Sequence, residues 1–468
     1  MRLQKAFTLI LAALLLLGLV SCGTPASPAT EAPSGGGSAP ATSQPAPPAG
    51  ETKKVELLTW TNEPTVLFLQ SIQAGFQEAY PGYELVISNV PSGDHDSARE
   101  TRVAANNVDI ISFQTFALPQ EDWNKDFVDK PTWQQYIDDG LLLDLTDEAF
   151  MKNYSADILA GNAYRDRFYS ICQGTVAYTG VFYNKAIFTE LGLSEPKTWD
   201  EFLAICEAVK NSGKYSVITA GAADNWPLNM FKNAIFNAMF TEDESSEIGR
   251  KLMTGELTHT DPSLAPIYTC MEQFASYMEP GVTGINYSDA PGRFAAGNMA
   301  MYADGSWTAP TIETANPDLD FGYFSLPGLS ARGDGLPPQY GIKYDLSFSV
   351  PSNAPNKEGA LNFLEYFSRK EIYTSFLNSV GGFSPTQADT ILENAFLNSL
   401  APGLQKPKLN PEFLIYGLKG VGEYGANGGF SFFYLDVLGG PYTKEQLAQA
   451  AADDYATALA SLSTLQGQ

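Results

Sequence analysis

Histidine is almost absent from this chain, which holds only His95 and His259 among its 468 residues. Neither lies in an H-E-x-x-H or H-x-x-x-H spacing, the arrangements that bring two imidazoles to one zinc ion, so the sequence argues against a zinc hydrolase. It also lacks the G-x-S-x-G nucleophile elbow, the S-x-x-K motif with its partners and the G-x-x-x-x-G-K-[ST] phosphate loop. The 53 acidic residues make chance carboxylate pairs inevitable, so such pairs are no evidence for a glycosidase. Since the catalytic and metal-binding motifs are missing, we expect no enzyme activity, no metal and no cofactor.

Cysteine is equally scarce, with four residues and no C-x-x-C spacing. Beyond Cys22 an odd number remains, so at least one of Cys172, Cys206 and Cys270 is a free thiol. Isolated cysteines of this kind are typical of small apolar core residues rather than of redox or metal sites. The sequence leaves open whether any two of them form a disulfide.

Basic residues are few. Lys and Arg number 28 against 53 Asp and Glu, which gives a net charge of −25, and there is no Lys/Arg run of five. A chain this acidic is repelled by polyphosphate and gains nothing from counterion release, so we expect no nucleic-acid partner. Anionic lipid repels it in the same way. Any membrane attachment must therefore be hydrophobic or covalent.

Long apolar runs are missing except at the N-terminus. Arg2 and Lys5 precede a mostly apolar run of 15 residues, 6–20, which is too short for a transmembrane helix of about 20 residues but typical of a signal peptide. The run ends at Leu19-Val20-Ser21-Cys22, which resembles the bacterial lipobox. We predict a lipoprotein signal peptide over 1–21, cleavage before Cys22 and lipidation of Cys22 with diacylglyceryl and palmitate. The alternative is an ordinary secretory signal followed by an incidental cysteine.

The next segment, 22–50, differs sharply in composition from the rest of the chain. After Cys22, all residues but Glu31 and Gln44 are Gly, Ala, Ser, Thr or Pro, which offers neither a core nor a helical run. We interpret it as a tether that could reach at most about 90 Å. Cleavage at Cys22 removes Arg2 and Lys5 and no acid, so the remaining chain has a net charge of −27.

Strand and helix patterns alternate after residue 50. Apolar strands are predicted over 55–60, 83–90 and 108–113, separated by helices that begin near Pro64 and Ser97. This alternation is typical of a mostly parallel α/β sheet, in which ligands collect at the carboxyl ends of strands. The carboxyl ends of the first and third strands carry Trp60, Asn62, Glu63 and Gln114.

Later segments continue the pattern. A capping box at Thr198 and Glu201 predicts a helix to about Lys210, and a strand over 215–220 is followed by Trp226. Further predicted elements are a helix at 290–296, a strand at 298–302, a strand at 343–350 and a helix at 357–368.

Several segments in the same order match one known family. They are Trp60, Phe76 through Tyr80-Pro81-Gly82, Asp109-Ile110-Ile111, Tyr183-Asn184-Lys185 through Pro196-Lys197-Thr198-Trp199-Asp200-Glu201, Phe294 through Gly305-Ser306-Trp307, and Asn356-Lys357-Glu358. Together they resemble the family 1 extracellular solute-binding proteins, the sugar-binding lipoproteins of ABC importers. The resemblance covers residues 55–465.

The resemblance implies a bilobal, periplasmic-binding-protein-like fold of type II, with two α/β domains joined by crossover hinge segments and a ligand cleft between them. Carried over by position, lobe 1 holds 51–173 plus 322–343, and lobe 2 holds 178–320 plus 345–468. Hinge closure would capture a neutral mono- or oligosaccharide for an ABC permease. The implied protein is a monomer, lipid-anchored at the extracytoplasmic face of a bacterial cell membrane, and the long tether is typical of Gram-positive lipoproteins.

Sugar sites combine aromatic platforms for C–H faces with polar groups for hydroxyls. The resemblance makes Trp307 and Trp226 stacking platforms, and it places Trp60 in the cleft and Tyr178 at the first crossover. Asn62, Glu63 and Gln114 follow from their positions at strand ends, and Asp304 precedes the turn to Trp307 and would accept from two hydroxyls. Tyr344 and Asp345 lie at the last crossover. For each aromatic the alternative is packing, and for each polar residue it is a solvated loop or a turn cap.

Other functions remain open at this point. The same fold would suit a binder of iron, a polyamine or a peptide, and a lipoprotein of this kind would also suit a sensor that does not transport. Iron clamps in related folds use paired tyrosines. No two tyrosines are adjacent in this chain, and tryptophan follows several predicted strands. These features favour a neutral ligand.

Overall fold

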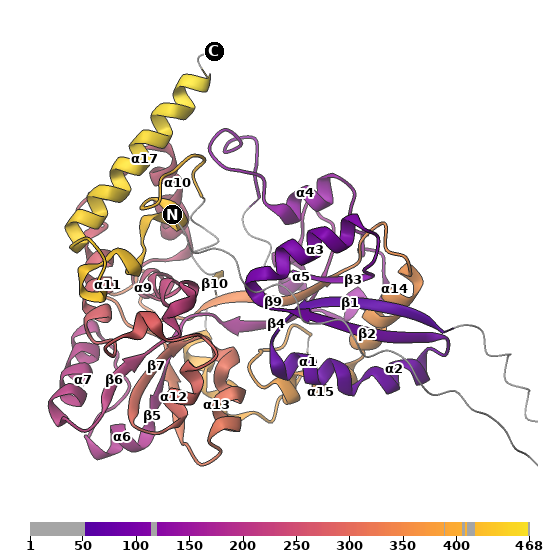
Figure 1. The fold of residues 1–468 in the computed structure, drawn as a ribbon, viewed down its shortest axis with the longest axis horizontal. Coiled ribbons are helices and arrows are strands. Elements are labelled where there is room, and N and C mark those ends of the chain that lie inside the picture. The colour runs from indigo at the N-terminus through magenta and orange to yellow at the C-terminus, as the bar shows by residue number, and fades with distance from the viewer. Residues whose placement is uncertain (1–51, 114–118, 388, 405–407, 410–416, 467–468) are drawn as a thin grey trace, which may run out of the picture. The chain divides into compact units, whose positions relative to one another are not determined.

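The computed structural model of the chain describes residues 52–466 except 114–118, 388, 405–407 and 410–416 (Figure 1). The predicted signal peptide at 1–21, the tether at 22–50, Cys22 and Gln114 lie outside these residues. None of the helices in the described part of the chain combines the length and hydropathy needed to cross a bilayer.

The first sheet gathers strands from both halves of the chain. Its order is β10-β9-β3-β1-β2, with β4 also paired to β9. β1 runs parallel to β2 and β3, whereas β9 runs antiparallel to β3 and β4. The strands are β1 (Lys53–Trp60), β2 (Tyr83–Val90), β3 (Ile110–Phe113), β4 (Ile171–Ala177), β9 (Gly341–Ser349) and β10 (Lys408–Leu409). The strand predicted at 83–90 is confirmed with its bounds.

Helices cover this sheet on both sides (Figure 1). One apolar cluster packs β1 against α1 (Glu63–Ser71), α2 (Gln73–Ala79), α14 (Lys357–Phe367) and α15 (Lys370–Val380). A separate cluster joins β3 to α3 (His95–Ala104) and α4 (Thr132–Asp138). α1 begins as its sequence predicts, because the Asn62 side chain accepts a hydrogen bond from the Thr65 N–H and Pro64 lies in the first turn.

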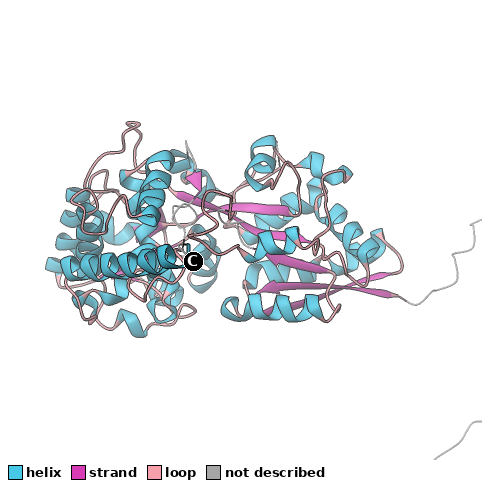
Figure 2. Cartoon of the chain, turned by 90° about the horizontal axis from the view of Figure 1, so that it is seen from above, coloured by secondary structure: helices cyan, strands magenta, loops and turns pink. Residues whose placement is uncertain are grey.

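The second sheet has the order β6-β7-β5-β8. β6 is parallel to β7, and β5 is antiparallel to both of its neighbours. Its strands are β5 (Gly180–Asn184), β6 (Ser216–Thr219), β7 (Met299–Asp304) and β8 (Phe321–Phe324). The largest apolar cluster of the described residues surrounds this sheet. Figure 2 shows both sheets and the helices packed on them from above.

The second sheet is associated with most of the remaining helices. The Thr198 capping box predicted for α7 is confirmed, since Thr198 Oγ1 accepts from the Glu201 N–H and the Glu201 carboxylate accepts from the Thr198 N–H. The helices are α6 (Lys185–Glu190), α7 (Trp199–Ser212), α8 (Trp226–Asn229), α9 (Phe231–Met239), α10 (Glu242–Thr254), α11 (Ala265–Ser276), α12 (Ala290–Ala295), α13 (Ala309–Ala315), α16 (Ala395–Ser399) and α17 (Lys444–Gln466), while α5 (Ala156–Asn162) precedes β4.

Two parts of the predicted lobe boundaries differ from the structure. Residues 321–324 form β8, which pairs with β5 in the second sheet, so the chain returns to the first sheet only at β9. The helices α14 and α15 then pack on the first sheet, although they were predicted to belong to lobe 2. An amphipathic pattern shows that a helix buries one face but does not say against which sheet, and this explains the error.

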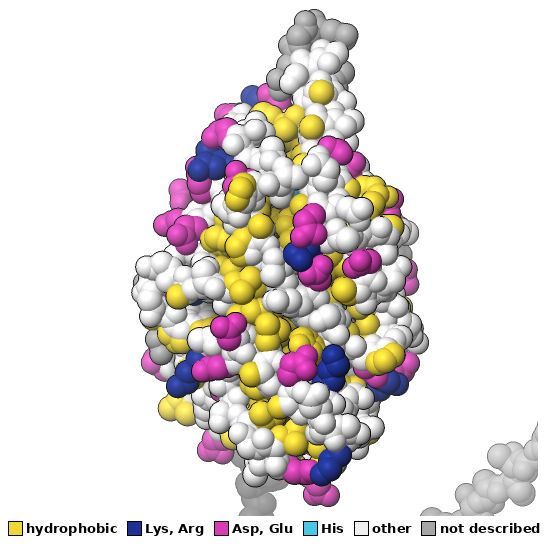
Figure 3. Space-filling view, turned by 90° about the vertical axis from the view of Figure 1, so that its left-hand side faces the viewer, with side chains coloured by type: hydrophobic (Ala, Val, Ile, Leu, Met, Phe, Trp, Pro, Cys, Tyr) yellow, Lys and Arg dark blue, Asp and Glu magenta, His cyan; other side chains and the backbone are white. Residues whose placement is uncertain are grey.

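The three cysteines in the described part of the chain are buried thiols without a disulfide. Burial raises the pKa of Cys172 and of Cys270 to about 12, which keeps these thiols protonated and unreactive. They serve as small core residues, as the sequence predicts. On the face shown in Figure 3, charged side chains are scattered among apolar and uncharged ones and form no patch of one sign.

Candidate functional site

A cavity of about 250 Å³ lies where the carboxyl ends of the first-sheet strands meet residues of the second lobe. The first lobe, which is built on the first sheet, contributes Trp60 at the end of β1 and residues just after β1 and β2. The second lobe, which is built on the second sheet, contributes aromatic side chains, and β9 contributes two charged ones. The lining residues are Trp60, Thr61, Asn62, Ser92, Tyr178, Trp226, Tyr287, Trp307, Lys343 and Asp345. The cavity therefore lies at the edge that the strand order predicts for a ligand.

Aromatic rings form the second-lobe wall of this cavity. The Trp307 ring lies 5.6 Å from the Tyr178 ring and 6.3 Å from the Trp226 ring, measured between centroids. Trp226 in turn lies 4.8 Å from Tyr287 and remains 39% exposed at the start of α8. A large apolar ring left in contact with solvent beside a cavity offers a stacking surface for a ligand.

A buried carboxylate holds this wall in place. Asp304, at the end of β7, accepts hydrogen bonds from the Tyr302 hydroxyl, from the Thr308 hydroxyl at 2.6 Å and from the Gly305 N–H at 2.8 Å. The indole N–H of Trp307 donates to the Tyr287 hydroxyl, which lies 3.4 Å from Thr308 Oγ1. These bonds link the Trp307 and Tyr287 side chains to the buried end of β7.

Asp304 is fully buried, and burial raises the pKa of its carboxyl to about 6 although the hydrogen bonds from Thr308 and Tyr302 lower it. Since it does not line the cavity, the expectation that Asp304 accepts directly from a ligand is not supported. Its burial at the end of β7 instead places it in the support of the aromatic wall.

The strand β9 presents alternate side chains to the cavity. Lys343 and Asp345 line it, as expected for residues two apart on one face of a strand. The Lys343 ammonium lies 5.1 Å from the Tyr178 ring centroid and 5.3 Å from that of Trp307. Tyr344 lies between these two residues and is buried elsewhere, its hydroxyl filling the space that a Cβ would need at Gly161. The prediction of Tyr344 as a cavity residue is therefore corrected by strand alternation.

Six of the predicted residues line the cavity, namely Trp60, Asn62, Tyr178, Trp226, Trp307 and Asp345. Trp60 packs against the edge of the His95 ring, at a centroid distance of 5.3 Å. Glu63 does not line it and instead borders another cavity, of about 550 Å³, together with Leu67 of α1 and Pro310 of α13. The reason is that Glu63 is already the first residue of α1, one position beyond the cap.

Four lining residues were not predicted. Thr61 and Ser92 follow the carboxyl ends of β1 and β2, so the strand-end rule applied fully would have found them. Lys343 lies two residues before the predicted Asp345, and strand alternation would have found it. Tyr287 comes from an irregular segment after the 3₁₀ turn Val282–Gly284, and no pattern in the sequence marks it.

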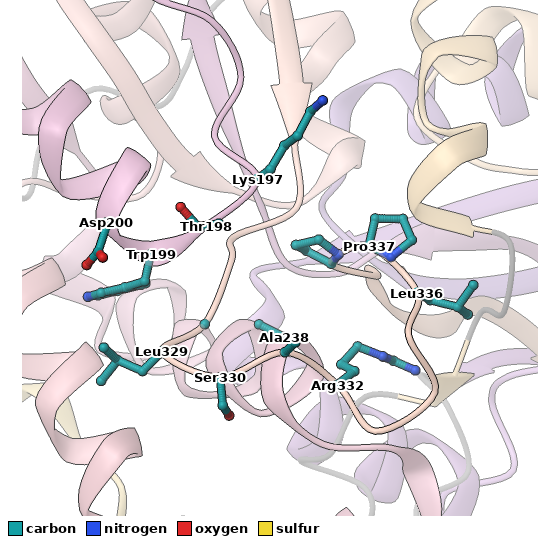
Figure 4. A pocket seen from close by; sticks show the side chains of 13 residues that line it. Lys197, Thr198, Trp199, Asp200, Ala238, Leu329, Ser330, Arg332, Leu336 and Pro337 are labelled. Carbon is teal, nitrogen blue, oxygen red and sulfur yellow. The ribbon is translucent and has the colours of Figure 1, made fainter.

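A third cavity, of about 310 Å³, lies within the second lobe between the start of α7 and the loop 328–338 (Figure 4). The side chains of Trp199 and Arg332 that border it are already hydrogen-bonded within the protein. The Trp199 indole N–H donates to Gln273 at 2.6 Å, and Arg332 pairs with Asp334 at 2.7 Å and donates to the Asn237 carbonyl at 2.9 Å. In Figure 4 the Lys197 side chain extends away from Ser330 and Arg332. The first cavity is therefore the better candidate site.

None of these three cavities suggests a metal centre. Within the described ranges, no three His, Cys, Asp or Glu side chains are grouped so that they could hold a metal ion. The buried His95 instead has its Nε2 3.1 Å from Ser112 Oγ.

Comparison with known proteins gives consistent results. The family model "Bacterial extracellular solute-binding protein" matches residues 61–373. The multiple sugar-binding protein of Streptococcus mutans is 24% identical over 304 residues, which span 64% of this chain and 67% of that protein. The diacetylchitobiose binding protein NgcE of Streptomyces coelicolor is 23% identical over 220 residues, 46% of this chain and 45% of that protein.

Solved structures share the fold. The solute-binding protein RafE in complex with raffinose superposes with a TM-score of 0.70 at 21% identity, covering 87% of this chain and all of that chain (100%). A chitin oligosaccharide binding protein also reaches 0.70, at 20% identity, with 88% of this chain and 100% of that chain covered. The predicted bilobal α/β fold is thereby confirmed.

Proposed function

Because the chain belongs to the family of bacterial extracellular solute-binding proteins, we propose that it captures a carbohydrate outside the cytoplasm and delivers it to the permease of an ABC importer. The family was predicted from the sequence, and that prediction is confirmed. The names of the relatives and structural neighbours, which include binders of raffinose and diacetylchitobiose, support a sugar as the ligand.

The observation that carries this proposal is the composition of the cavity wall. Trp307, Trp226 and Tyr178 offer ring faces, on which the C–H face of a sugar ring packs. Asn62 and Asp345 offer polar groups for its hydroxyls.

Ligand capture by closure of the two lobes is the second part of the proposal. Trp60, Asn62 and Ser92 come from the first lobe, whereas Trp226 and Trp307 come from the second. A ligand that contacts both sets gains its full binding energy only when the lobes are close together, so it favours the closed state. Lys343 and Asp345 lie on β9, the strand that follows the return of the chain from the second sheet to the first.

Anchoring completes the proposal. The lipobox-like residues 19–22 and the tether after them would hold the two lobes at the outer face of a bacterial cell membrane through lipidated Cys22. A Gram-positive membrane suits a tether of this length. We also propose that the protein is a monomer.

The other ligand classes fit the cavity less well. Asp345 is the one carboxylate among the lining residues and already pairs with Lys343, whereas a polyamine carries several ammonium groups that need acidic partners. An iron clamp would need paired tyrosine ligands, whereas the Tyr287 hydroxyl accepts from Trp307 and the Tyr178 ring packs on Trp307.

A thermal-shift screen of the chain without its first 21 residues, with Cys22→Ser, tests the proposal. The panel contains raffinose, stachyose, diacetylchitobiose, a xylo-oligosaccharide and galactose, with putrescine and ferric citrate as non-sugar ligands. A sugar present at 100 times its Kd adds about 2.7 kcal/mol of stability, which is an easily measured shift. Stabilisation by putrescine or ferric citrate alone would contradict a carbohydrate ligand.

A further inference from the structure

Lys343 and Asp345 form an ion pair with unusual surroundings. Lys343 Nζ lies 3.4 Å from Asp345 Oδ1, and the two side chains are only 10% and 8% exposed. Both nevertheless line the cavity, between the aromatic wall and the first lobe. The pair therefore belongs to the small part of the interior that a bound ligand would touch.

The pair is not saturated with hydrogen bonds. An ammonium has three donors, yet the described residues show no hydrogen bond from Lys343 Nζ, and its distance to Asp345 exceeds the ordinary value of about 2.9 Å. Asp345 Oδ1 accepts from the Leu346 N–H at 3.1 Å, and no described residue bonds to Oδ2. Donors on Lys343 and an acceptor on Asp345 thus remain available side by side.

Such a pair is costly to the folded protein. Removing two charges from water costs several kcal/mol per ion, and only good geometry with further hydrogen bonds offsets that cost. Neither Lys343 Nζ nor Asp345 Oδ2 is among the described buried atoms that lack a hydrogen-bond partner, so both remain open to solvent in the cavity. A ligand that enters the cavity can therefore replace water at these two atoms.

The surroundings also restrict the ligand's charge. Asp345 lines the cavity, Asp304 supports the Trp307 and Tyr287 side chains, and Asp224 accepts from the Tyr287 N–H at 2.6 Å. Of these three carboxylates only Asp345 lines the cavity, where it repels an anionic ligand, while Lys343 repels a cationic one. An uncharged ligand can use the donor and the acceptor together without breaking the pair.

We propose that Lys343 and Asp345 form a specificity-determining pair that recognises two adjacent free hydroxyl groups on an uncharged sugar ring stacked on Trp307. Lys343 donates to one hydroxyl oxygen, and Asp345 accepts from the neighbouring hydroxyl. The cation–π contacts hold the ammonium over the rings of Tyr178 and Trp307, within the aromatic wall of the cavity. The ligand class is therefore a neutral saccharide with an unsubstituted vicinal diol. This inference rests on the proposed function.

Calorimetric titration of three variants tests the pair. Lys343→Met keeps the length of the side chain but leaves Asp345 without its partner, so it can fail to fold. The double variant Lys343→Met with Asp345→Asn removes both charges and avoids that problem. Lys214→Met is the matched control, because Lys214 pairs with Glu190 at 2.6 Å on the surface and is 63% exposed.

The probes are raffinose, stachyose, diacetylchitobiose and xylotriose as neutral sugars, and digalacturonate as an acidic one. We expect a neutral probe to bind the wild type, the double variant to bind that probe about 10- to 100-fold more weakly, and Lys214→Met to bind it normally. Each monodeoxy analogue of that probe is then compared with the parent sugar. We expect at least one analogue to bind the wild type more weakly than the parent sugar does, but to bind the double variant as well as the parent sugar does.

Three results would overturn the proposed role of Lys343 and Asp345. They are binding by the double variant within threefold of the wild type, tighter wild-type binding of digalacturonate than of every neutral probe, and an equal loss for each deoxy analogue in both proteins. Each of these leaves a carbohydrate ligand intact. Failure of every probe to bind the wild type would instead refute the proposed function, and the inference with it.

Discussion

The two lobes contribute to the cavity in different ways. The first lobe supplies residues fixed by local structure, since Trp60 ends β1, Asn62 caps α1, and Thr61 and Ser92 lie within two residues of the ends of β1 and β2. The second lobe supplies an aromatic wall whose rings are held by Tyr287 and by the buried carboxylate of Asp304. The first contribution depends on neighbours in sequence and the second on contacts between distant segments, so the two should respond differently to mutation and to pH.

The second lobe also holds a buried histidine. His259 Nδ1 lies 2.9 Å from the Tyr268 hydroxyl, and its Nε2 has no hydrogen-bond partner among the described residues. Burial lowers the pKa of His259 to about 3. The unfolded chain binds a proton here below pH 6.5 and the folded one does not, so the stability present above pH 6.5 is lost as the pH falls toward 3.

The largest expected effect is therefore acid destabilisation of the second lobe, by about 4 kcal/mol between pH 6.5 and 3 from His259 alone. Urea unfolding at a series of pH values measures it. His259→Gln, which cannot take up the proton, should remove this part of the pH dependence. An unchanged slope in that variant would show that His259 is not protected from protonation.

Asp304 should act in the opposite direction. Its folded pKa is raised by burial from 3.8 to about 6, so the folded state binds the extra proton between these values and gains stability as the pH falls from 6 to 4. At pH 7 the ionised carboxylate costs about 3 kcal/mol. The difference in stability between wild type and Asp304→Asn, followed from pH 4 to 7, isolates this contribution. A difference that does not vary with pH would contradict it.

Binding should also depend more on the second lobe than on the first. We expect Trp307→Ala to weaken binding of the sugar found in the screen by about 1 to 3 kcal/mol, because its loss also frees Tyr287 and Lys343. Trp60→Ala should cost less, since Trp60 contacts only the edge of His95 among the described rings. Calorimetry on both, with Trp123→Ala as an exposed control outside the cavity, compares the lobes. Equal losses of affinity in Trp60→Ala and Trp307→Ala would show that the two lobes contribute equally to binding.

The smallest effects concern helix caps. Thr198→Ala removes the capping box of α7 and should lower stability by about 1 kcal/mol without changing affinity. Asn62 both caps α1 and lines the cavity. Asn62→Ala should therefore lower the free energy of unfolding and weaken sugar binding by about 1 kcal/mol each. Thermal unfolding and calorimetry on the two variants separate a cap with a single role from one with two. Normal sugar affinity in Asn62→Ala would limit Asn62 to capping.

Much of this architecture was predictable because short-range signals are strong. The strand at 83–90, the cap at Asn62 and the capping box at Thr198 follow from alternation and from side chains that bond backbone three residues away. The strand-end rule also identified Trp60 and Asn62. By contrast, Glu63 was predicted for the cavity because the rule does not say where a loop ends and a helix begins.

The sequence by itself determined several of the strands and helices, the family and the places along the chain where a ligand could meet strand ends. Only the tertiary structure decided which sheet takes β8, α14 and α15, since an apolar face fits either core equally well in sequence. It also decided that Asp304 is buried and that Tyr287 joins Trp307. The physical reason is range: caps and strand patterns arise among residues a few positions apart, whereas burial and side-chain networks depend on segments that meet only in the folded chain.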